Sequence, residues 1–191
     1  MEHLSKEFWA SRYEAGTTGW DLGEVSPPIK AYIDQLEDKS VKIIIPGCGN
    51  GYEAEYLWNQ GFKNVHVIDL AKEPLDNLNS RCTEIPKSQL HQGDFFEHNG
   101  TYDLIFEQTM FCAIDPSLRQ KYADKAYELL RPGGKLVGVL FSRDFDGGPP
   151  YGGNKEEYLR YFSAFKNVSM EPCYNSIEPR QGSELFISVM A

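Results

Sequence analysis

The feature that most constrains the fold is a regular alternation of short apolar runs with longer polar stretches. Short apolar runs between turn residues indicate buried strands, and polar stretches with apolar side chains at helical spacing indicate helices. Strands that alternate with helices in this way predict an α/β fold built on a parallel sheet. The runs expected as strands are 41–46, 64–69, 88–92, 102–108, 134–141, 165–174 and 183–190.

Helix signals fall between these runs and before the first of them. The last two strands are separated only by "NSIEPRQG", which is too short for a helical crossover, so they should form an antiparallel hairpin at one edge of the sheet. The expected helices are 5–14, 27–37, 51–61, 72–82, 117–134 and 154–162.

Charge and hydropathy exclude several classes of partner. The 191 residues fit one domain and carry 28 acidic against 19 basic side chains, a net charge of −9. Basic residues are nowhere dense enough to neutralise a row of phosphates, so nucleic acid and anionic membranes are not expected as partners. The start of the chain lacks a signal-peptide pattern and no run is long enough to span a bilayer, which predicts a cytoplasmic protein.

Cysteine spacing indicates neither a metal site nor a disulfide framework. The four cysteines lie far apart, without a CxxC pair and without histidines at ligand spacing, so we expect reduced thiols and no metal. They are Cys48, Cys82, Cys112 and Cys173.

The stretch "IIIPGCGNGYEAEYL" places three glycines between a strand and a helix, where a ligand can approach the backbone. The alternative is three turn glycines without a ligand. A dinucleotide site would need a glycine at Tyr52, and a nucleotide-phosphate cradle would need a Lys-Ser/Thr pair after the loop. The glycines are Gly47, Gly49 and Gly51.

Acidic residues follow the next two strands. Asp69 ends the second strand, 22 residues after Gly47, where a carboxylate can accept hydrogen bonds from both ribose hydroxyls; the alternative is a cap for the next helix. The motif "GDFF" ends the third strand and offers Asp94 to an exocyclic amine and Phe95 or Phe96 to an adenine face. Together the three motifs predict a site for adenosine without phosphates.

With these residues the chain resembles a class I S-adenosylmethionine-dependent methyltransferase. The motif "RPGGKL" before the fifth strand is typical of that class. The motifs "WDLGEVSPP", "PGCGNGYE", "GDFF", "MFCAIDPSLRQKYA" and "GGPPYG" are similar to those of the thiopurine methyltransferase family, halide/thiol branch, over nearly the whole chain. The resemblance implies a Rossmann-like, seven-stranded mixed sheet in the order 3-2-1-4-5-7-6, with helices on both faces. It also implies one domain, with lid helices in 1–40 and a cofactor-binding core in 41–191.

The resemblance implies roles for individual residues around S-adenosyl-L-methionine and its product S-adenosyl-L-homocysteine. The cofactor-binding residues would be Trp9, Tyr13, Trp20, Gly47, Gly49, Asp69, Asp94, Phe95, Glu107 and Arg119. Trp20 would close a lid over the cofactor, or else simply pack on the core. The acceptor pocket would be formed by Trp20, Met110, Phe111 and Tyr151.

The expected reaction is direct in-line transfer of a methyl group to a small soft nucleophile: a thiol, hydrosulfide or halide. Arg119 is the candidate catalytic residue because a guanidinium stabilises a thiolate over a thiol. The alternative is a surface ion pair with Asp115. Met110, where halide/thiol relatives usually carry Phe, makes the wall of the pocket softer and leaves the acceptor open.

Other functions stay open beside this one. An aromatic heterocyclic thiol, as in thiopurine methylation, is the second candidate acceptor, and a non-catalytic module that binds S-adenosylmethionine is an alternative from another class. Hydride transfer is disfavoured by Tyr52. The Pro-Pro-Tyr of "GGPPYGG" follows the fifth strand rather than the fourth, which disfavours methylation of nucleic acid. A monomer is expected, because no exposed apolar helix suggests a protein partner.

Overall fold

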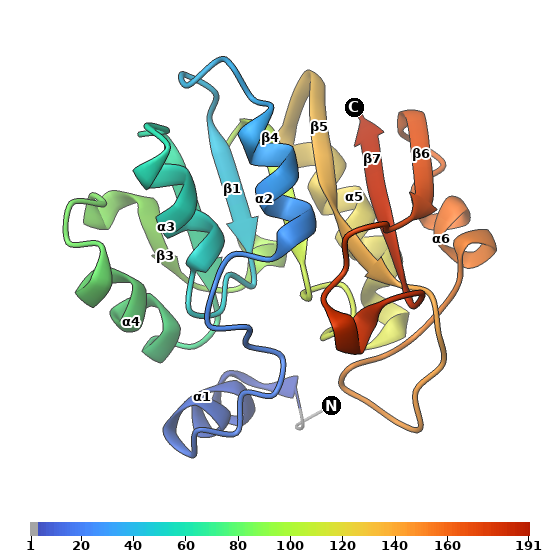
Figure 1. The fold of residues 1–191 in the computed structure, drawn as a ribbon, viewed down its shortest axis with the longest axis horizontal. Helices are drawn as coiled ribbons and strands as arrows, with labels where there is room; N and C mark the ends of the chain where they lie inside the picture. Colours follow the sequence, from blue (N-terminus) through green and yellow to red (C-terminus); the bar gives the residue numbers. More distant parts are fainter. Residues whose placement is uncertain (1–3) are drawn as a thin grey trace.

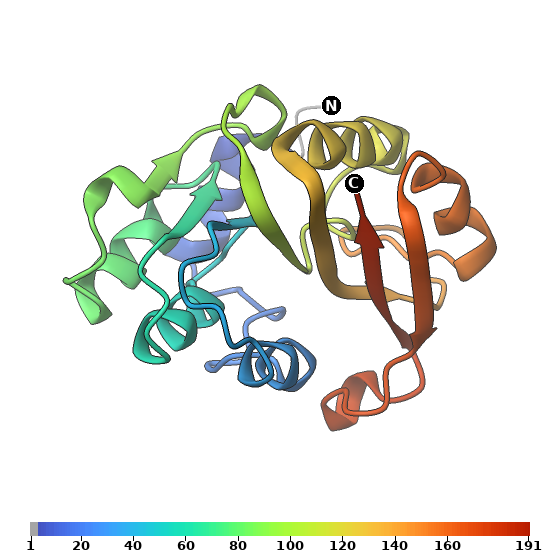
Figure 2. The same cartoon turned by 90° about the horizontal axis from the view of Figure 1, so that it is seen from above.

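The apolar runs form one seven-stranded sheet in a computed structural model, which describes residues 4–191 (Figures 1 and 2). The strand order is β3-β2-β1-β4-β5-β7-β6, which confirms the prediction. The strands are β1 Ile43–Pro46, β2 Val65–Asp69, β3 Leu90–Gln92, β4 Tyr102–Gln108, β5 Leu130–Phe141, β6 Lys166–Pro172 and β7 Glu184–Met190.

The first five strands pair in parallel, and β7 pairs antiparallel with both β5 and β6. The C-terminal hairpin is therefore confirmed. All four residues of β1 are buried, because β1 lies in the middle of the sheet and is covered on both faces. This central position explains the uninterrupted apolar run "IIIP".

Helices cover both faces of the sheet, as predicted (Figure 2). One face packs against α2 (Pro27–Asp34), α3 (Tyr52–Asn59) and α4 (Glu73–Arg81), and the other against α5 (Arg119–Leu129) and α6 (Lys155–Tyr161). Short 3₁₀ helices lie between these elements, at Lys87–Gln89, Phe95–Glu97, Pro116–Leu118 and Glu178–Arg180.

The two N-terminal helices differ in their packing. Ile29 and Ile33 of α2 are fully buried in the same cluster as β1, so α2 belongs to the core layer. The preceding helix α1 (Lys6–Glu14) buries no side chain completely and lies at the edge of the molecule (Figure 1). Of the range 1–40 predicted as the lid, residues 1–3 lie outside the described residues and α2 packs on the sheet, so α1 and the segment that follows it stay as the candidate lid.

The end of α5 differs from the sequence prediction. The predicted helix ran to Gly134, whereas α5 ends at Leu129 and β5 begins at Leu130. Pro132 lacks the N–H that would continue a helix, and Gly133 has a φ of 81°. The chain therefore leaves the helix before "RPGG" rather than after it.

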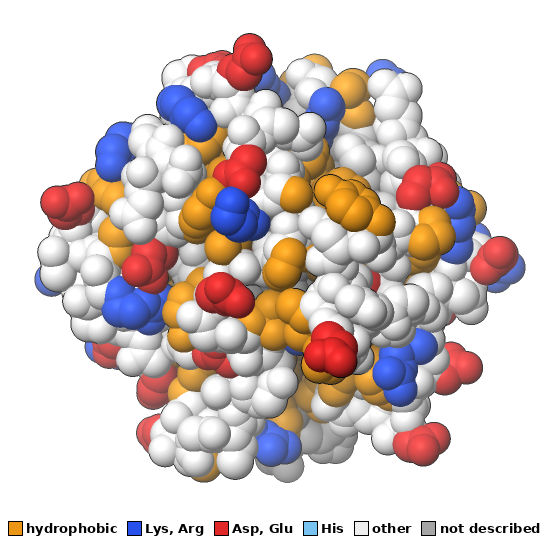
Figure 3. Space-filling view, viewed as in Figure 1, with side chains coloured by type: hydrophobic (Ala, Val, Ile, Leu, Met, Phe, Trp, Pro, Cys, Tyr) orange, Lys and Arg blue, Asp and Glu red, His pale blue; other side chains and the backbone are white. Residues whose placement is uncertain are grey.

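Within residues 4–191, no helix is long and apolar enough to cross a membrane. The same residues contain no group of three or more His, Cys, Asp or Glu side chains that could hold a metal ion. Acidic and basic side chains are mixed over the face shown in Figure 3.

Candidate active site

A cavity of about 680 Å³ opens at the carboxyl edge of the parallel strands. Each parallel strand contributes lining residues where it ends, because parallel strands bring their carboxyl ends to one edge. These residues are Gly47 after β1, Asp69 at the end of β2, Gly93 after β3, Thr109 after β4 and Phe141 at the end of β5.

The glycine loop after β1 forms the floor of this cavity. Gly47 has a φ of 57°, and a Cβ on it would lie 2.9 Å from the Cβ of Met110. A side chain at this position is therefore excluded both by the backbone conformation and by the loop after β4. Gly49 is not among the lining residues, but its N–H donates to Asp69 Oδ2 at 3.1 Å.

Asp69 is held in place by backbone amides and faces the cavity. Its Oδ2 accepts from the Gly49 N–H and its Oδ1 from the Ala71 N–H at 3.0 Å. Burial raises the pKa of Asp69 to about 6, because the loss of water around the carboxylate outweighs the stabilising hydrogen bonds. The carboxylate keeps lone pairs that can accept hydrogen bonds from ligand hydroxyls.

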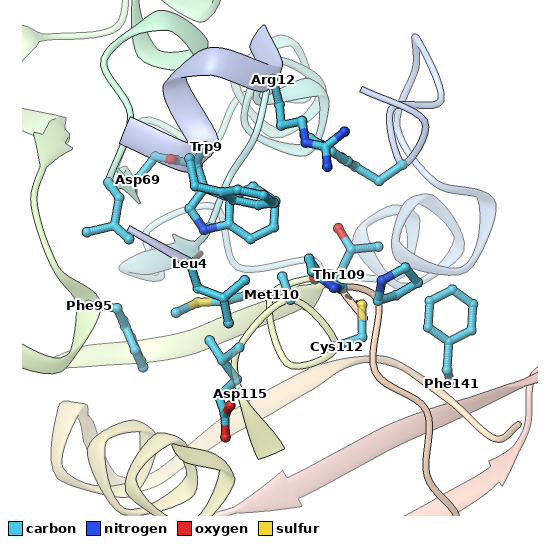
Figure 4. Close-up of a pocket in the computed structure, with 18 of the residues that line it drawn as sticks. Leu4, Trp9, Arg12, Asp69, Phe95, Thr109, Met110, Cys112, Asp115 and Phe141 are labelled. Carbon is cyan, nitrogen blue, oxygen red and sulfur yellow. Dashed lines mark hydrogen bonds between the residues drawn. The ribbon is translucent and has the colours of Figure 1, made fainter. Parts of the chain in front are cut away.

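Asp94 and Phe95 line the same end of the cavity. Asp94 Oδ1 accepts from the Phe96 N–H at 2.9 Å and so caps the short helix Phe95–Glu97, which orients the Phe95 ring. Phe95 is buried, and its ring contacts Tyr122 of α5 with a centroid separation of 5.3 Å. Figure 4 shows Asp69 and Phe95 on one side of the cavity.

Three aromatic residues from α1 and the following segment cover the cavity. Trp20 meets Trp9 and Tyr13 edge to face, with ring centroids 5.6 and 5.8 Å apart. Asp21 accepts a short hydrogen bond from Asn50 of the glycine loop, and Trp20 O accepts from Arg180 Nη2 at 3.1 Å. The covering residues are therefore hydrogen-bonded to the glycine loop after β1 and to the loop between β6 and β7.

The opposite end of the cavity is mostly apolar. Thr109, Cys112 and Phe141 lie there, with Trp9 and Met110 between them and Asp69 (Figure 4). Thr109 has a φ of 66°, a backbone conformation that is costly for a β-branched residue and that concentrates at functional sites. Burial raises the pKa of Cys112 to about 12, which keeps its thiol neutral.

A guanidinium also reaches this apolar end. The Cζ of Arg180 lies 5.5 Å from the centroid of Phe141, and its side chain is 12% exposed. Its Nη1 is 3.6 Å from Glu184 Oε1, and the buried carboxylate of Glu53 also interacts with its charge. The "NSIEPRQG" hairpin loop, which the sequence marked only as a short connection, thus supplies a charged group to the site.

Arg119, the residue expected to be catalytic, does not line the cavity. Its side chain is 1% exposed, with Nη1 3.0 Å from Glu157 Oε1 and Nη2 donating to the carbonyls of Tyr151 at 3.1 Å and Gly152 at 2.8 Å. The structure corrects its expected place: Arg119 is bonded to the loop behind the cavity wall and is neither exposed nor paired in a surface ion pair with Asp115.

Three more expected residues lie behind the wall. Glu107 is fully buried and accepts from the Phe111 N–H at 2.9 Å and from the Tyr122 hydroxyl. Phe111 is 1% exposed and packs under the Arg119 guanidinium. Tyr151 donates its N–H to Cys112 O at 2.7 Å, and neither it nor Glu107 or Phe111 is a lining residue.

Eight of the residues expected at the site do line one cavity, although they come from distant parts of the chain. They are Trp9, Tyr13, Trp20, Gly47, Asp69, Asp94, Phe95 and Met110. The sequence analysis did not assign most of the residues at the apolar end, because they are scattered over the end of β5 and several loops, and the motif "GGPPYG" did not show which of its residues line the cavity. The unassigned residues are Thr109, Phe141, Arg143, Phe145, Pro149, Pro150 and Arg180.

The residues present fit the adenosyl part of S-adenosylmethionine. A half-buried carboxylate with free lone pairs lies at the end of β2, an aromatic ring lines the cavity beyond β3, and a glycine that cannot carry a Cβ opens the loop after β1. This donor set suits two ribose hydroxyls and an adenine.

Comparison with known proteins identifies the family. The family model for thiopurine S-methyltransferase (TPMT) matches residues 4–184. The probable thiol methyltransferase 2 of Arabidopsis thaliana is 31% identical over 192 residues, which cover 96% of this chain and 84% of that protein. Thiocyanate methyltransferase 1 of Brassica oleracea is 32% identical over 191 residues, with the same coverage.

A solved structure supports the fold. The 1,6-didemethyltoxoflavin-N1-methyltransferase of Burkholderia thailandensis, solved with S-adenosylhomocysteine, superposes with a TM-score of 0.75 at 16% identity and covers 99% of this chain and 88% of that one. At this identity the likeness concerns the fold alone. The match over residues 4–184, together with the two plant relatives, shows that the chain belongs to the thiopurine S-methyltransferase family of S-adenosylmethionine-dependent methyltransferases.

Proposed function

We propose that the protein methylates a small soft nucleophile, such as a thiol, hydrosulfide or halide, by direct in-line displacement. Its plant relatives are named for thiol and thiocyanate acceptors. The observation that carries the proposal is the apolar end of the cavity, where Arg180 supplies a positive charge. A soft acceptor that is anionic, or that ionises readily, suits this end because the Arg180 guanidinium favours the anionic form.

The residues at the end of the cavity that contains Asp69 and Phe95 would hold the cofactor (Figure 4). When bound, S-adenosylmethionine supplies a methyl group on a positively charged sulfur. Asp69 accepts hydrogen bonds from the ribose hydroxyls, Phe95 packs against the adenine, and Trp9 and Trp20 exclude water. A dry site favours reaction between an anion and a cation because the charges disappear as the new bond forms.

Arg180, at the apolar end of the cavity, acts on the acceptor. Its guanidinium favours a thiolate over a thiol and offsets the loss of water around a halide. Cys112 stays a neutral thiol and takes no part as a nucleophile, which agrees with direct transfer. Holding an acceptor in line within this cavity contributes most of the acceleration, up to about 7–11 kcal/mol in intramolecular models.

A bulkier aromatic thiol, as in thiopurine methylation, is a second candidate acceptor. Phe141 and Phe145 line the acceptor end and form an edge-to-face pair with centroids 5.0 Å apart. Such a pair can hold the flat ring of an aryl or heterocyclic thiol.

The experiment is product analysis with S-adenosylmethionine and a panel of hydrosulfide, iodide and thiophenol. We expect one methylated product for each S-adenosylhomocysteine formed. Arg180→Lys keeps a positive charge without the planar guanidinium and should retain part of the activity. Arg180→Gln should lose more activity at a pH below the pKa of the thiol than at a pH above it. Tight cofactor binding without product from any acceptor would contradict the proposal and favour a non-catalytic binding module.

A further inference from the structure

The mouth of the acceptor end carries a second guanidinium that the proposed reaction does not use. Arg143 lines the cavity and follows β5 in the loop 142–153. Its Cζ lies 4.8 Å from the centroid of Phe145, and Phe145 in turn meets Phe141, over which Arg180 lies. Phe141 and Phe145 are therefore in contact, and each has a guanidinium over its ring. Arg180 lies near the apolar end and Arg143 toward solvent.

The two arginines differ in how their charges are compensated. Arg180 is mostly buried, donates to the Trp20 carbonyl and lies near Glu184. Arg143 is exposed, and among residues 4–191 no carboxylate lies within ion-pair distance of its guanidinium, although Asp144 and Asp146 are near it in sequence. Arg143 thus has donors available to a ligand, and its position over a ring limits the directions in which they point.

The loop that carries Arg143 is held firmly. The Gly153 N–H donates to Arg143 O at 3.1 Å, and a Cβ on Gly152 would lie 1.8 Å from the same oxygen. Arg119 binds the carbonyls of Tyr151 and Gly152 from behind. The backbone of Arg143 is therefore fixed relative to the cavity, which a specific contact requires.

The residues that line the acceptor end include aromatic rings and prolines beyond Phe141. A hydrosulfide or halide is comparable to a water molecule, whose share of liquid volume is about 30 Å³. An acceptor of that size can touch only a few of the residues that line this end, which include Phe145, Arg143, Pro149 and Pro150. A flat organic thiol would fill this space.

We propose that Arg143 is a specificity-determining residue that binds an anionic group on the acceptor, and that the preferred acceptors are aromatic thiols carrying a carboxylate away from the sulfur. The inference rests on the proposed function and deepens it. The sulfur lies toward Arg180 and the apolar end, the ring lies against Phe141 and Phe145, and the carboxylate meets Arg143 at the mouth.

The test compares three thiols that differ only in one substituent: 4-mercaptobenzoate, thiophenol and 4-(aminomethyl)thiophenol, each at a pH where the thiol is ionised. We expect the natural protein to show the highest kcat/KM with 4-mercaptobenzoate. Arg143→Gln should lower that value about tenfold, the effect of one charge-assisted hydrogen bond, and leave thiophenol within about twofold. Arg143→Glu should reverse the order and favour the aminomethyl compound.

Binding provides a readout that does not depend on turnover. The methylated product 4-(methylthio)benzoate should bind the complex with S-adenosylhomocysteine more tightly than thioanisole does, by calorimetry, and Arg143→Gln should remove the difference. Arg160→Gln is the matched control, because Arg160 is exposed on α6, outside the cavity lining, and the substitution changes the net charge equally.

The outcomes separate this inference from the function on which it rests. Turnover of thiophenol and 4-mercaptobenzoate with equal kcat/KM, unchanged by Arg143→Gln, would overturn the role of Arg143 and leave the methyltransferase proposal intact. An absence of product with every thiol and halide would overturn the proposed function itself. An equal loss in Arg160→Gln would assign the effect to net charge rather than to the subsite.

Discussion

At the scale of single residues, we expect Asp69 to make ligand binding depend on pH. Its two oxygens accept backbone N–H groups, yet burial still raises its pKa to about 6. Protonation removes acceptors that ribose hydroxyls need. The raised pKa also means that, without ligand, ionising Asp69 lowers the stability of the fold as pH rises toward 6, a cost that the proposed binding role would explain.

Affinity for S-adenosylmethionine should therefore fall as pH decreases through 6. We expect the dissociation constant at pH 5 to be about tenfold larger than at pH 7, because most Asp69 side chains are protonated at the lower pH. Calorimetry from pH 5 to pH 8 measures this. Asp69→Asn should bind weakly and without this pH dependence; a natural protein whose affinity is constant across the range would contradict the assignment of Asp69.

Glu107 affects stability rather than binding. It is fully buried, and burial raises its pKa from 4.5 to about 7, so the fold favours its neutral form. The stabilisation is complete below pH 4.5 and is lost as pH rises through 7. Relative to Glu107→Gln, the natural protein should lose up to about 3 kcal/mol of unfolding free energy between pH 5 and pH 8.

Urea unfolding of both proteins at the two pH values measures this difference. The comparison cancels other titrating groups, such as Asp69, because both proteins contain them. Any fixed effect of the amide on the Phe111 and Tyr122 hydrogen bonds is the same at each pH. A difference between the two proteins that does not change with pH would contradict the role of Glu107.

At the scale of elements, the loop 142–153 depends on a buried cation. Arg119 begins α5 and binds the carbonyls of Tyr151 and Gly152, while Glu157 of α6 accepts from its Nη1. This loop carries the wall of the acceptor end. We therefore propose that Arg119 positions this loop for the acceptor, although Arg119 itself does not line the cavity.

Arg119→Lys should raise the KM for thiophenol, by about fivefold or more, and leave the dissociation constant of S-adenosylmethionine within about twofold. Lysine keeps the charge but cannot bond two carbonyls and Glu157 at once with a planar fork. Leu57→Ala, a fully buried change on α3 far from this loop, is the control for lost stability. A similar rise in thiophenol KM in both variants would assign the effect to destabilisation.

At the scale of the whole molecule, we expect the stability of the core to depend little on the residues that cover the cavity. Helix α1 has no fully buried side chain, and Trp20 is held by rings and by one hydrogen bond from Arg180. The core lies between the sheet and helices α2 to α6. Loss of the cover should therefore weaken ligand binding more than it weakens the unliganded fold.

S-adenosylhomocysteine at 100 times its dissociation constant should raise the melting temperature by about 5–10 °C, from a linkage of about 2.7 kcal/mol for a chain of this size. Trp20→Ala should show a smaller rise at the same concentration and nearly the natural melting temperature without ligand. Thermal scans with and without ligand measure both. If Trp20→Ala lowered the melting temperature of the unliganded protein as much as Ile33→Ala, a substitution in the core, Trp20 would belong to the core rather than to the cover.

Much of the fold was predictable because its signals are local. The buried runs, the hairpin too short for a crossover and the glycine loop each depend on neighbouring residues, and their order along the chain restricts the sheet to few topologies. The end of α5 was predicted too late, because the helical spacing of Leu and Tyr runs directly into "RPGG" and the turn itself depends on packing against β4.

The sequence by itself determined the sheet order and the family, and it predicted residues that line one end of the cavity, because Gly47, Asp69 and Phe95 follow successive strands whose carboxyl ends must meet at one edge. Only the tertiary structure decided the acceptor end. Arg119 turns away from the cavity and Arg180 enters it beside Trp20, 160 positions away. Which way a side chain points across such a distance depends on long-range packing, and no local pattern encodes it.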